Sequence, residues 1–511
     1  MASRVLLVLA LALAMAGCAV NPVTGKHELS LIPVSQQIAM GEEQYVPSQQ
    51  SQGGVYSVDK ELTSYVSEVG QRLAAVSDTR LPYEFVVLNN SVPNAWALPG
   101  GKIAVNRGLL TALDNEAELA AVLGHEVVHA AAGHSAAAMQ RGMLLQGVMI
   151  ATTLASSDSE YGNYIVGGAQ LGAQLVTQKY SRSAELEADL YGTRYMKRAG
   201  YNPEAAVTLQ QTFVRLFEGQ KTSWIDGLFA SHPPSQERVD ANEKTAEALG
   251  KTGELGTERW NEKMSYLRSR QDAYLAFDDA GQLASKKDYA GALAKIDNAI
   301  KIEPKEPRFY GLKGDILLEQ KKYLPASEEF DKALNRDPGY YEYYLGRGLA
   351  YSRLGKTDRA RSDLERSNQL LPTAIANNEL GQMMVAAGNT NEAKGYFETA
   401  MAASGPIGQQ AANSYVRLDL PDHPDKYIEA KAGLTADGEL VAAIHNLAGI
   451  DVSDIAVTFI VTAAGQDATR TVSIDRIGAG QQGTISSGMR FSDADNVTAV
   501  SARVVAARAP N

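Results

Sequence analysis

The chain has 511 residues, more than the roughly 100 to 200 of a typical domain, which predicts three or more folded units. Its 45% hydrophobic and 21% charged residues are typical of a globular protein and exclude a fibrous or wholly disordered chain. A net charge of -11, without a cluster of Lys and Arg, argues against a nucleic-acid partner.

The N-terminus has the pattern of a secretory signal peptide over residues 1–17. One Arg precedes an apolar run of about a dozen residues, which is too short to span a membrane and ends in small residues. Cys18, the only cysteine, follows Ala16 and Gly17 as in a bacterial lipobox, which predicts a lipid anchor on Cys18. The alternative is a soluble periplasmic protein cleaved near Ala16, but a lone cysteine cannot form an internal disulfide, which favours the lipoprotein. Ala19 is not the Asp that retains lipoproteins at the inner membrane, so the resemblance to lipoproteins implies an outer-membrane anchor facing the periplasm.

Residues 18–55 are polar and turn-rich, and they predict a lipid-anchored leader with one short helix near residues 35–44. The domain predicted over residues 56–260 opens with apolar positions at helical spacing and continues with the strand patterns YEFVVLNN and KIAV. Helices follow these strands, so we expect a mainly helical α+β fold. Between residues 143 and 177, two apolar arms of about 13 or 14 residues are shorter than the roughly 20 residues of a membrane span, which favours a packed helical hairpin over membrane insertion.

Two further units follow along the chain. A repeat of about 34 residues runs through residues 273–420 and predicts an all-α solenoid of tetratricopeptide repeats. Residues 425–511 contain β-branched runs separated by Gly, Asp and Asn turns, which predict an all-β sandwich without visible catalytic residues. The recurring positions of the repeat are Ala292, Ala326 and Ala360, then Ile296, Phe330 and Leu364, and then Pro304, Pro338 and Pro372.

The stretch HEVVHAAAGH, which begins at His125, continues an apolar helical pattern. Residues four apart on a helix lie about 40° apart around the axis, so His125 and His129 share a face and can bind one metal ion. Burying two histidines without a ligand or partner would be costly, which favours a metal site. Glu126 lies about 100° from His125, where a carboxylate can take a proton from water beside the metal. His134 is expected on the opposite helix face as a core or hydrogen-bonded residue.

A catalytic zinc site needs a third protein ligand and an open position for water. In SRSAELEAD, Glu185 and Asp189 share one helix face and Glu187 points away, although this spacing equally allows a solvent-exposed acidic face. His232 in FASHPPSQERV precedes two prolines and, taken alone, is typical of a loop residue. The spacing therefore leaves the third ligand open.

In this order, HEVVH, SRSAELEAD and SHPPSQER resemble the BepA, HtpX and CAAX-prenyl-protease family of zinc metallopeptidases. NPVTGKHELSLIP and NAWALPGGKIAVNRGLL are similar to its periplasmic members of the BepA and LoiP type, and the repeats match the architecture of that branch. The resemblance implies a zincin-type domain with one zinc ion, which is bound by His125, His129 and Glu185. It also implies that Glu126 is the general base and that Asp189 orients the site.

The same resemblance implies two further roles. His232 matches a histidine that either assists the transition state or occupies the fourth position of the zinc ion as a repressing latch, and both roles remain open. The segment LPGGKIAV is expected to be the edge strand on which an extended substrate pairs through its backbone. That strand comprises Gly101, Lys102, Ile103, Ala104 and Val105.

The resemblance finally implies a zinc-dependent endopeptidase of the bacterial cell envelope that cleaves misfolded or misassembled envelope proteins by zinc-activated water. The repeats would dock clients, among them an outer-membrane assembly component, in outer-membrane protein quality control. The alternative is a chaperone or scaffold whose repeats bind clients while the zinc site is latched or largely inactive. A pure repeat adaptor with a dead site is disfavoured because every expected ligand is present. Turnover separates enzyme from scaffold, because only a scaffold keeps its function when Glu126 is replaced by Gln.

Overall fold

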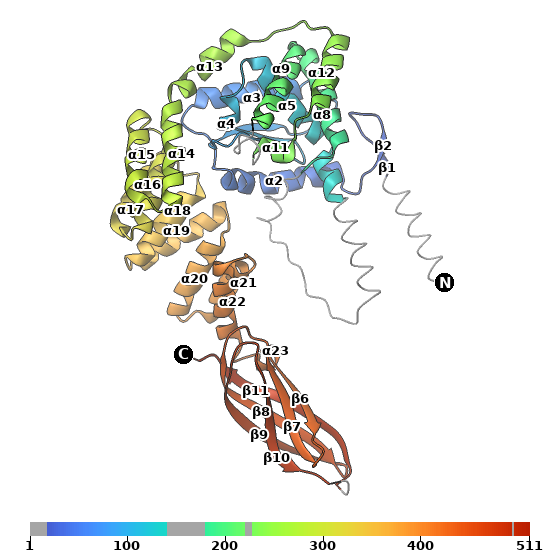
Figure 1. The fold of residues 1–511 in the computed structure, drawn as a ribbon, viewed down its shortest axis with the longest axis vertical. Helices are drawn as coiled ribbons and strands as arrows, with labels where there is room; N and C mark the ends of the chain where they lie inside the picture. The colour runs from blue at the N-terminus through green and yellow to red at the C-terminus, as the bar shows by residue number, and fades with distance from the viewer. Residues whose placement is uncertain (1–17, 141–178, 220–226, 493–494, 511) are drawn as a thin grey trace. The chain divides into compact units, whose positions relative to one another are not determined.

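The computed structural model (Figure 1) describes residues 18–140, 179–219, 227–492 and 495–510. The predicted signal peptide and the predicted hairpin between residues 143 and 177 lie outside these ranges. Within them, no helix combines the length and the apolar character needed to cross a membrane. The chain divides into two compact units, residues 1–356 with 369–371, and residues 357–368 with 372–511.

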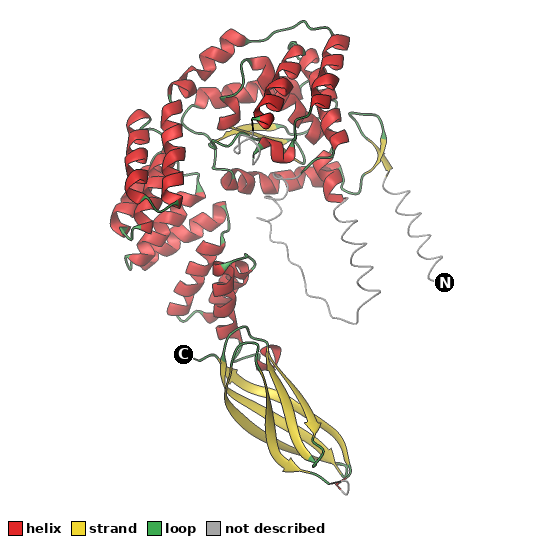
Figure 2. Ribbon diagram, viewed as in Figure 1, coloured by secondary structure: helices red, strands yellow, loops and turns green. Residues whose placement is uncertain are grey.

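The domain that carries the HEVVH motif has helices on both faces of a small sheet (Figure 2). Alternate side chains of a strand point to opposite faces, and here they enter two cores. Val87 and Ile103 pack in the large core with α3 and α5, whereas Leu88 and Ala104 pack against Tyr45 of α2. The elements of this domain are β1 (Cys18–Val20), β2 (His27–Leu29), α2 (Val34–Ser51), α3 (Lys60–Ala74), β3 (Glu84–Leu88), β4 (Ala95–Leu98), β5 (Lys102–Asn106), α4 (Arg107–Leu110), α5 (Glu116–Ala131), α8 (Arg182–Arg198), α9 (Glu204–Glu218), α11 (Leu228–Ser231), α12 (Gln236–Leu249) and α13 (Thr257–Ser269).

The strand KIAV is not at the edge of this sheet, so the prediction of an edge strand at residues 101–105 is wrong. β5 lies between β3, to which it is parallel, and β4, to which it is antiparallel. All five β5 residues are buried, and Lys102 forms an ion pair with Glu84 of β3, while Gly101 lies in the preceding turn. A continuous apolar run is typical of such a central strand, but the order of strands depends on pairing with distant segments. In the described part of the chain, β4 pairs with β5 alone.

α2 is longer than the short helix predicted near residues 35–44, and contacts with distant segments hold it at two points. Gly41 lies against the backbone of Pro99, where an added Cβ atom would come within 1.9 Å of the carbonyl oxygen. At the other end, the Gln50 side chain donates to the backbone of Gly339 at 2.9 Å and accepts from the backbone of Tyr341 at 2.8 Å. Neither contact is visible in local sequence spacing.

The repeat region confirms the predicted all-α fold. Phe330 of one helix lies where added Cβ atoms on Gly314 and Gly346 would come within 2.8 and 2.2 Å of its ring, so small residues are required there. The helices of this region are α14 (Gln271–Ser285), α15 (Tyr289–Ile302), α16 (Pro307–Glu319), α17 (Tyr323–Leu334), α18 (Tyr341–Arg353), α19 (Thr357–Leu370), α20 (Ala374–Ala386), α21 (Thr390–Met401) and α22 (Pro406–Asp419).

The C-terminal region confirms the predicted β fold. Two antiparallel sheets have the strand orders β10-β7-β6 and β11-β8-β9, and their inner side chains form one hydrophobic core around Phe459. A short helix precedes the strands. The elements are α23 (Pro424–Tyr427), β6 (Ile428–Leu434), β7 (Glu439–Asn446), β8 (Val452–Ala463), β9 (Gln466–Ile477), β10 (Gln482–Arg490) and β11 (Val497–Arg508).

Candidate metal centre

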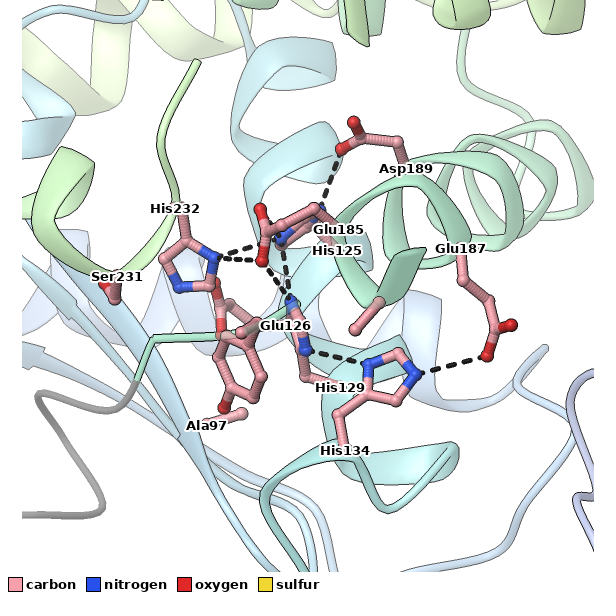
Figure 3. A network of polar contacts seen from close by, with 12 residues as sticks. Ala97, His125, Glu126, His129, His134, Glu185, Glu187, Asp189, Ser231 and His232 are labelled. Atoms are coloured by element: carbon pink, nitrogen blue, oxygen red, sulfur yellow. Dashed lines mark hydrogen bonds and ion pairs between the residues drawn. The ribbon is translucent and has the colours of Figure 1, made fainter. Parts of the chain in front are cut away.

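Three segments bring the expected metal ligands together (Figure 3). His125, Glu126 and His129 lie on α5, Glu185 lies on α8, and His232 directly follows α11. The Nε2 atoms of His125 and His129 are 2.9 Å apart. Glu185 Oε1 lies 3.3 Å from His129 Nε2 and 3.0 Å from His232 Nδ1. Residues more than 100 positions apart thus meet at one point.

The two helices that carry the expected ligands, α5 and α8, cross at a pair of glycines. A Cβ atom added to Gly192 of α8 would lie 2.9 Å from the backbone nitrogen of His125 and 3.0 Å from the carbonyl carbon of Gly124. The side chains of Asn115 and Ser181 cap the first turns of α5 and α8. The close crossing therefore sets the distance between the ligands on the two helices.

The donor atoms fit a zinc ion. His125, His129, Glu185 and His232 each offer one ligand atom, and these atoms all lie within 4.8 Å of one another. Imidazole nitrogens with one carboxylate are the ligands of catalytic zinc, which uses three protein ligands and keeps a further position for water or substrate. None of the four residues is more than 8% exposed, and burial holds the pKa of His129 well below its usual value, so its ring stays neutral and can bind a cation.

Arg238, which the sequence patterns did not single out, fixes two acidic residues behind the ligands. His125 Nδ1 donates to Asp189 Oδ1 at 2.9 Å, which leaves Nε2 free for a metal. Arg238 donates to both oxygens of Asp189 at 2.6 and 2.8 Å, and its Nη1 lies 2.9 Å from Glu185 Oε2. Burial opposes the charge of both carboxylates, but the charges of His232 and Arg238 at Glu185, and of Arg238 at Asp189, hold the pKa of each below its usual value. The only signal for Arg238 was its place in SHPPSQER.

His134 does not point away from the expected metal ligands, so the predicted position on the opposite helix face is wrong, whereas the expected hydrogen-bonded, buried histidine is confirmed. α5 ends at Ala131, and Gly133 follows with a φ of +68°, a conformation that favours glycine. The 100° step of a helix therefore no longer applies at His134. The turn places His134 Nδ1 2.9 Å from His129 Nδ1, and His134 Nε2 lies 3.1 Å from Glu187 Oε1 (Figure 3).

Glu126 and His232 face each other across the centre. Glu126 Oε1 lies 3.6 Å from His232 Nε2, and Glu126 Oε2 has no hydrogen-bond partner among the described residues. Burial raises the pKa of Glu126, which favours proton uptake by this carboxylate. His232 Nδ1 lies 3.3 Å from His125 Nε2, within the group of ligand atoms. Burial opposes a charge on His232, but Glu185 and Glu126 outweigh it and raise its pKa.

A tyrosine that no sequence spacing indicated covers His129. The Tyr180 ring stacks on the His129 ring with centroids 3.8 Å apart, and its hydroxyl hydrogen-bonds to Ser135 at 2.8 Å. Ser135 Oγ also donates to the carbonyl oxygen of Ala97 at 3.4 Å. Ala97 belongs to β4, so this strand, rather than β5, is the sheet edge that lies beside the metal ligands.

Comparison with known proteins agrees with this geometry. Residues 60–246 match peptidase family M48, and residues 307–340 and 341–372 each match a tetratricopeptide repeat. The chain is 27% identical over 341 residues to the beta-barrel assembly-enhancing protease of Yersinia pestis, which covers 61% of this chain and 69% of that protein. It is 32% identical over 186 residues to the metalloprotease YcaL of Escherichia coli strain K12, covering 35% of this chain and 70% of YcaL. The metalloprotease LoiP of the same strain is also 32% identical, over 187 residues that cover 35% of this chain and 67% of LoiP.

Proposed function

The chain belongs to peptidase family M48 and is a zinc metalloendopeptidase, and from this membership we propose that it cleaves unfolded or misassembled proteins of the bacterial envelope. We assign the zinc ion to His125, His129 and Glu185. The observation that carries this proposal is the buried group of ligand atoms within 4.8 Å of one another. Beside it lies Glu126 Oε2, which has no hydrogen-bond partner among the described residues.

Glu126 is the proposed general base. A bound zinc ion supplies Lewis acidity, which polarises the scissile carbonyl and lowers the pKa of water. Glu126 takes a proton from the attacking water on a carboxylate oxygen and passes it to the amine that leaves. Burial raises the pKa of Glu126, which favours uptake of this proton by the carboxylate. Asp189 and Arg238 hold the ligands in place while the proton moves.

We assign substrate positioning to β4, residues Ala95–Leu98. The strand pairs on one side with β5, and Ala97 lies beside the site through Ser135. An extended peptide that adds to a sheet edge is held by its backbone, so recognition tolerates many side chains. Unfolded segments offer such free backbone, whereas folded barrels do not.

Contacts between the first repeats and the metal-site domain support our proposal that the repeats bring client proteins to this site. Buried Glu306, just before α16, accepts hydrogen bonds from Asn89 Nδ2 at 2.8 Å and from the Tyr274 hydroxyl at 2.9 Å. Asn89 follows β3 of the metal-site domain and Tyr274 belongs to α14, so these buried bonds join the domain to the repeats. We propose that clients bind the repeats and that their unfolded segments reach β4.

We place the protein at the periplasmic face of the outer membrane, anchored through Cys18. The proposal rests on the lipobox-like sequence at Cys18. The printed name of the Yersinia pestis relative, which links that protein to β-barrel assembly, supports outer-membrane proteins and their assembly machinery as clients.

His232 favours a second candidate, a chaperone or scaffold with a latched site. Its Nδ1 lies 3.0 Å from Glu185 Oε1 and 3.3 Å from His125 Nε2, where it can take the fourth position of the zinc ion. We propose that His232 is a repressing latch on the zinc site. If the chain is an enzyme, this latch opens; if the chain is a scaffold, it stays closed.

The test compares wild type with His232→Ala in cleavage of an unfolded and a refolded outer-membrane β-barrel protein, with bound zinc measured in each sample. If the open form is about one-tenth of the population, freeing the site raises the rate of cleavage of the unfolded protein about tenfold. His27→Ala, which removes an exposed histidine, is the matched control and should change nothing. A lower rate in His232→Ala would show that His232 assists catalysis. No cleavage by either chain, with zinc bound, would favour the scaffold.

A further inference from the structure

Two different sets of polar side chains, which we call arms, contact the Nδ1 atoms of His125 and His129. These are the ring nitrogens that the proposed zinc ion does not use. His125 Nδ1 contacts Asp189, which Arg238 holds. His129 Nδ1 contacts His134 Nδ1 at 2.9 Å, and His134 Nε2 contacts Glu187 Oε1 at 3.1 Å. The second arm, His134 with Glu187, has no role in the mechanism above.

While both rings are neutral, the hydrogen bonds of the second arm can be satisfied with one arrangement of protons only. A ring nitrogen binds a metal through its lone pair, so a histidine that binds through Nε2 must carry its proton on Nδ1. His129 Nδ1 then donates to His134 Nδ1, and His134 Nε2 carries the proton that it donates to the Glu187 carboxylate. In the reverse arrangement, His129 Nε2 is protonated, and a bare nitrogen of His134 faces the carboxylate.

Glu187 therefore selects the arrangement in which His129 can bind a metal. An ionised carboxylate only accepts hydrogen bonds, so it stabilises the N–H form of His134 Nε2. Burial strengthens this selection, because an unpaired polar group in the interior is costly. His134 is 8% exposed and His129 is fully buried. The side chain of Glu187 is 15% exposed. Its ionic contact with exposed Lys26, at 3.5 Å, is expected to add little.

We propose that His134 and Glu187 are positioning residues that hold His129 in the form and orientation that binds zinc. They form a carboxylate–histidine arm on His129 that is the counterpart of the Asp189 arm on His125. This inference rests on the proposed zinc site. The turn at Gly133, which brings His134 back toward the ligands, is then part of the metal centre.

The test measures the zinc affinity of the full chain by competition with a chelator, so that the readout does not depend on proteolysis. Partners of this kind are typically worth 10- to 100-fold in metal affinity. We expect His134→Leu and Glu187→Ala to weaken zinc binding about 10- to 100-fold. His134→Gln should retain most of the affinity, because its amide can accept from His129 and donate to Glu187. His27→Ala is the matched control with wild-type affinity.

The outcomes separate this inference from the zinc site itself. If wild type binds zinc and both His134→Leu and Glu187→Ala bind it equally well, the positioning role is overturned and the zinc site stands. If His134→Gln is as weak as His134→Leu, His134 only packs, and the proposal also falls. A wild-type chain that binds no zinc overturns the zinc site and this inference with it. Thermal unfolding of each variant in chelator identifies any variant that has not folded. Glu187→Gln, which keeps the shape of the side chain, then replaces that variant, and we expect it to lose less zinc affinity.

Discussion

Replacing Glu126 with Gln is expected to lower the rate of peptide hydrolysis about 10²- to 10⁴-fold, the usual contribution of a general base, and to leave zinc bound. Glu126 is outside the group of ligand atoms, its Oε2 has no hydrogen-bond partner in the described part of the chain, and its Oε1 lies 3.6 Å from His232 Nε2. Gln has the same shape but cannot take up a proton at neutral pH. The measurement is kcat/KM on an unfolded barrel protein together with zinc content, in the wild-type and the His232→Ala backgrounds, so that a latch cannot hide the effect.

Glu42→Gln is the control for this prediction, because Glu42 is exposed on α2 and makes no contact with the metal ligands. We expect it to keep the wild-type rate and zinc content. Undiminished cleavage by Glu126→Gln would contradict the proposed role as general base. Loss of zinc from that variant would instead make Glu126 a ligand.

Replacing Arg238 with Met is expected to lower the free energy of unfolding by about 3–5 kcal/mol, because removing one partner of a buried ion pair leaves uncompensated charge. Arg238 is 5% exposed and forms ion pairs with both Asp189 and Glu185. Denaturant unfolding in chelator measures the change in the transition of the unit that contains the site. Chelator matters because bound zinc would compensate part of the lost positive charge.

Two variants define the cause of that loss. Arg182→Met removes an exposed arginine that pairs with Glu237, and it should change stability little. Arg238→Lys keeps the charge but loses the paired geometry that binds both oxygens of Asp189, so we expect an intermediate loss. If Arg238→Met is as stable as wild type, Arg238 does not stabilise the charged forms of Asp189 and Glu185, and the prediction fails.

Local spacing predicted the fold of the repeat region and of the C-terminal region because each of them repeats a short pattern. The recurring alanines and aromatic residues of the repeats mark close helix crossings, such as Phe330 against Gly314. The β-branched run of β8 alternates between buried and more exposed side chains along the strand. The order of strands around β5 was not predictable in this way, because pairing with β3 and β4 is decided by tertiary contacts.

At the metal centre, residue spacing predicted the direction of side chains correctly within an unbroken helix and wrongly beyond the end of that helix. His125 and His129 lie within α5, so their predicted common face is found in the structure. His134 lies beyond the end of that helix, after Gly133, and turns back to the site instead of away from it. Arg238 acts on Asp189, 49 residues upstream, and no local pattern connects the two.

Zinc binding by wild type and Glu185→Ala tests the central claim most directly. Each chain is stripped with chelator and titrated with zinc, and bound metal per chain is measured, with Glu42→Ala as the exposed control. The proposed centre predicts one tightly bound zinc ion in wild type and in the control, and none bound tightly in Glu185→Ala. A wild-type chain without zinc, or a Glu185→Ala chain that binds it as tightly as wild type, would contradict the assignment of His125, His129 and Glu185 as the metal ligands.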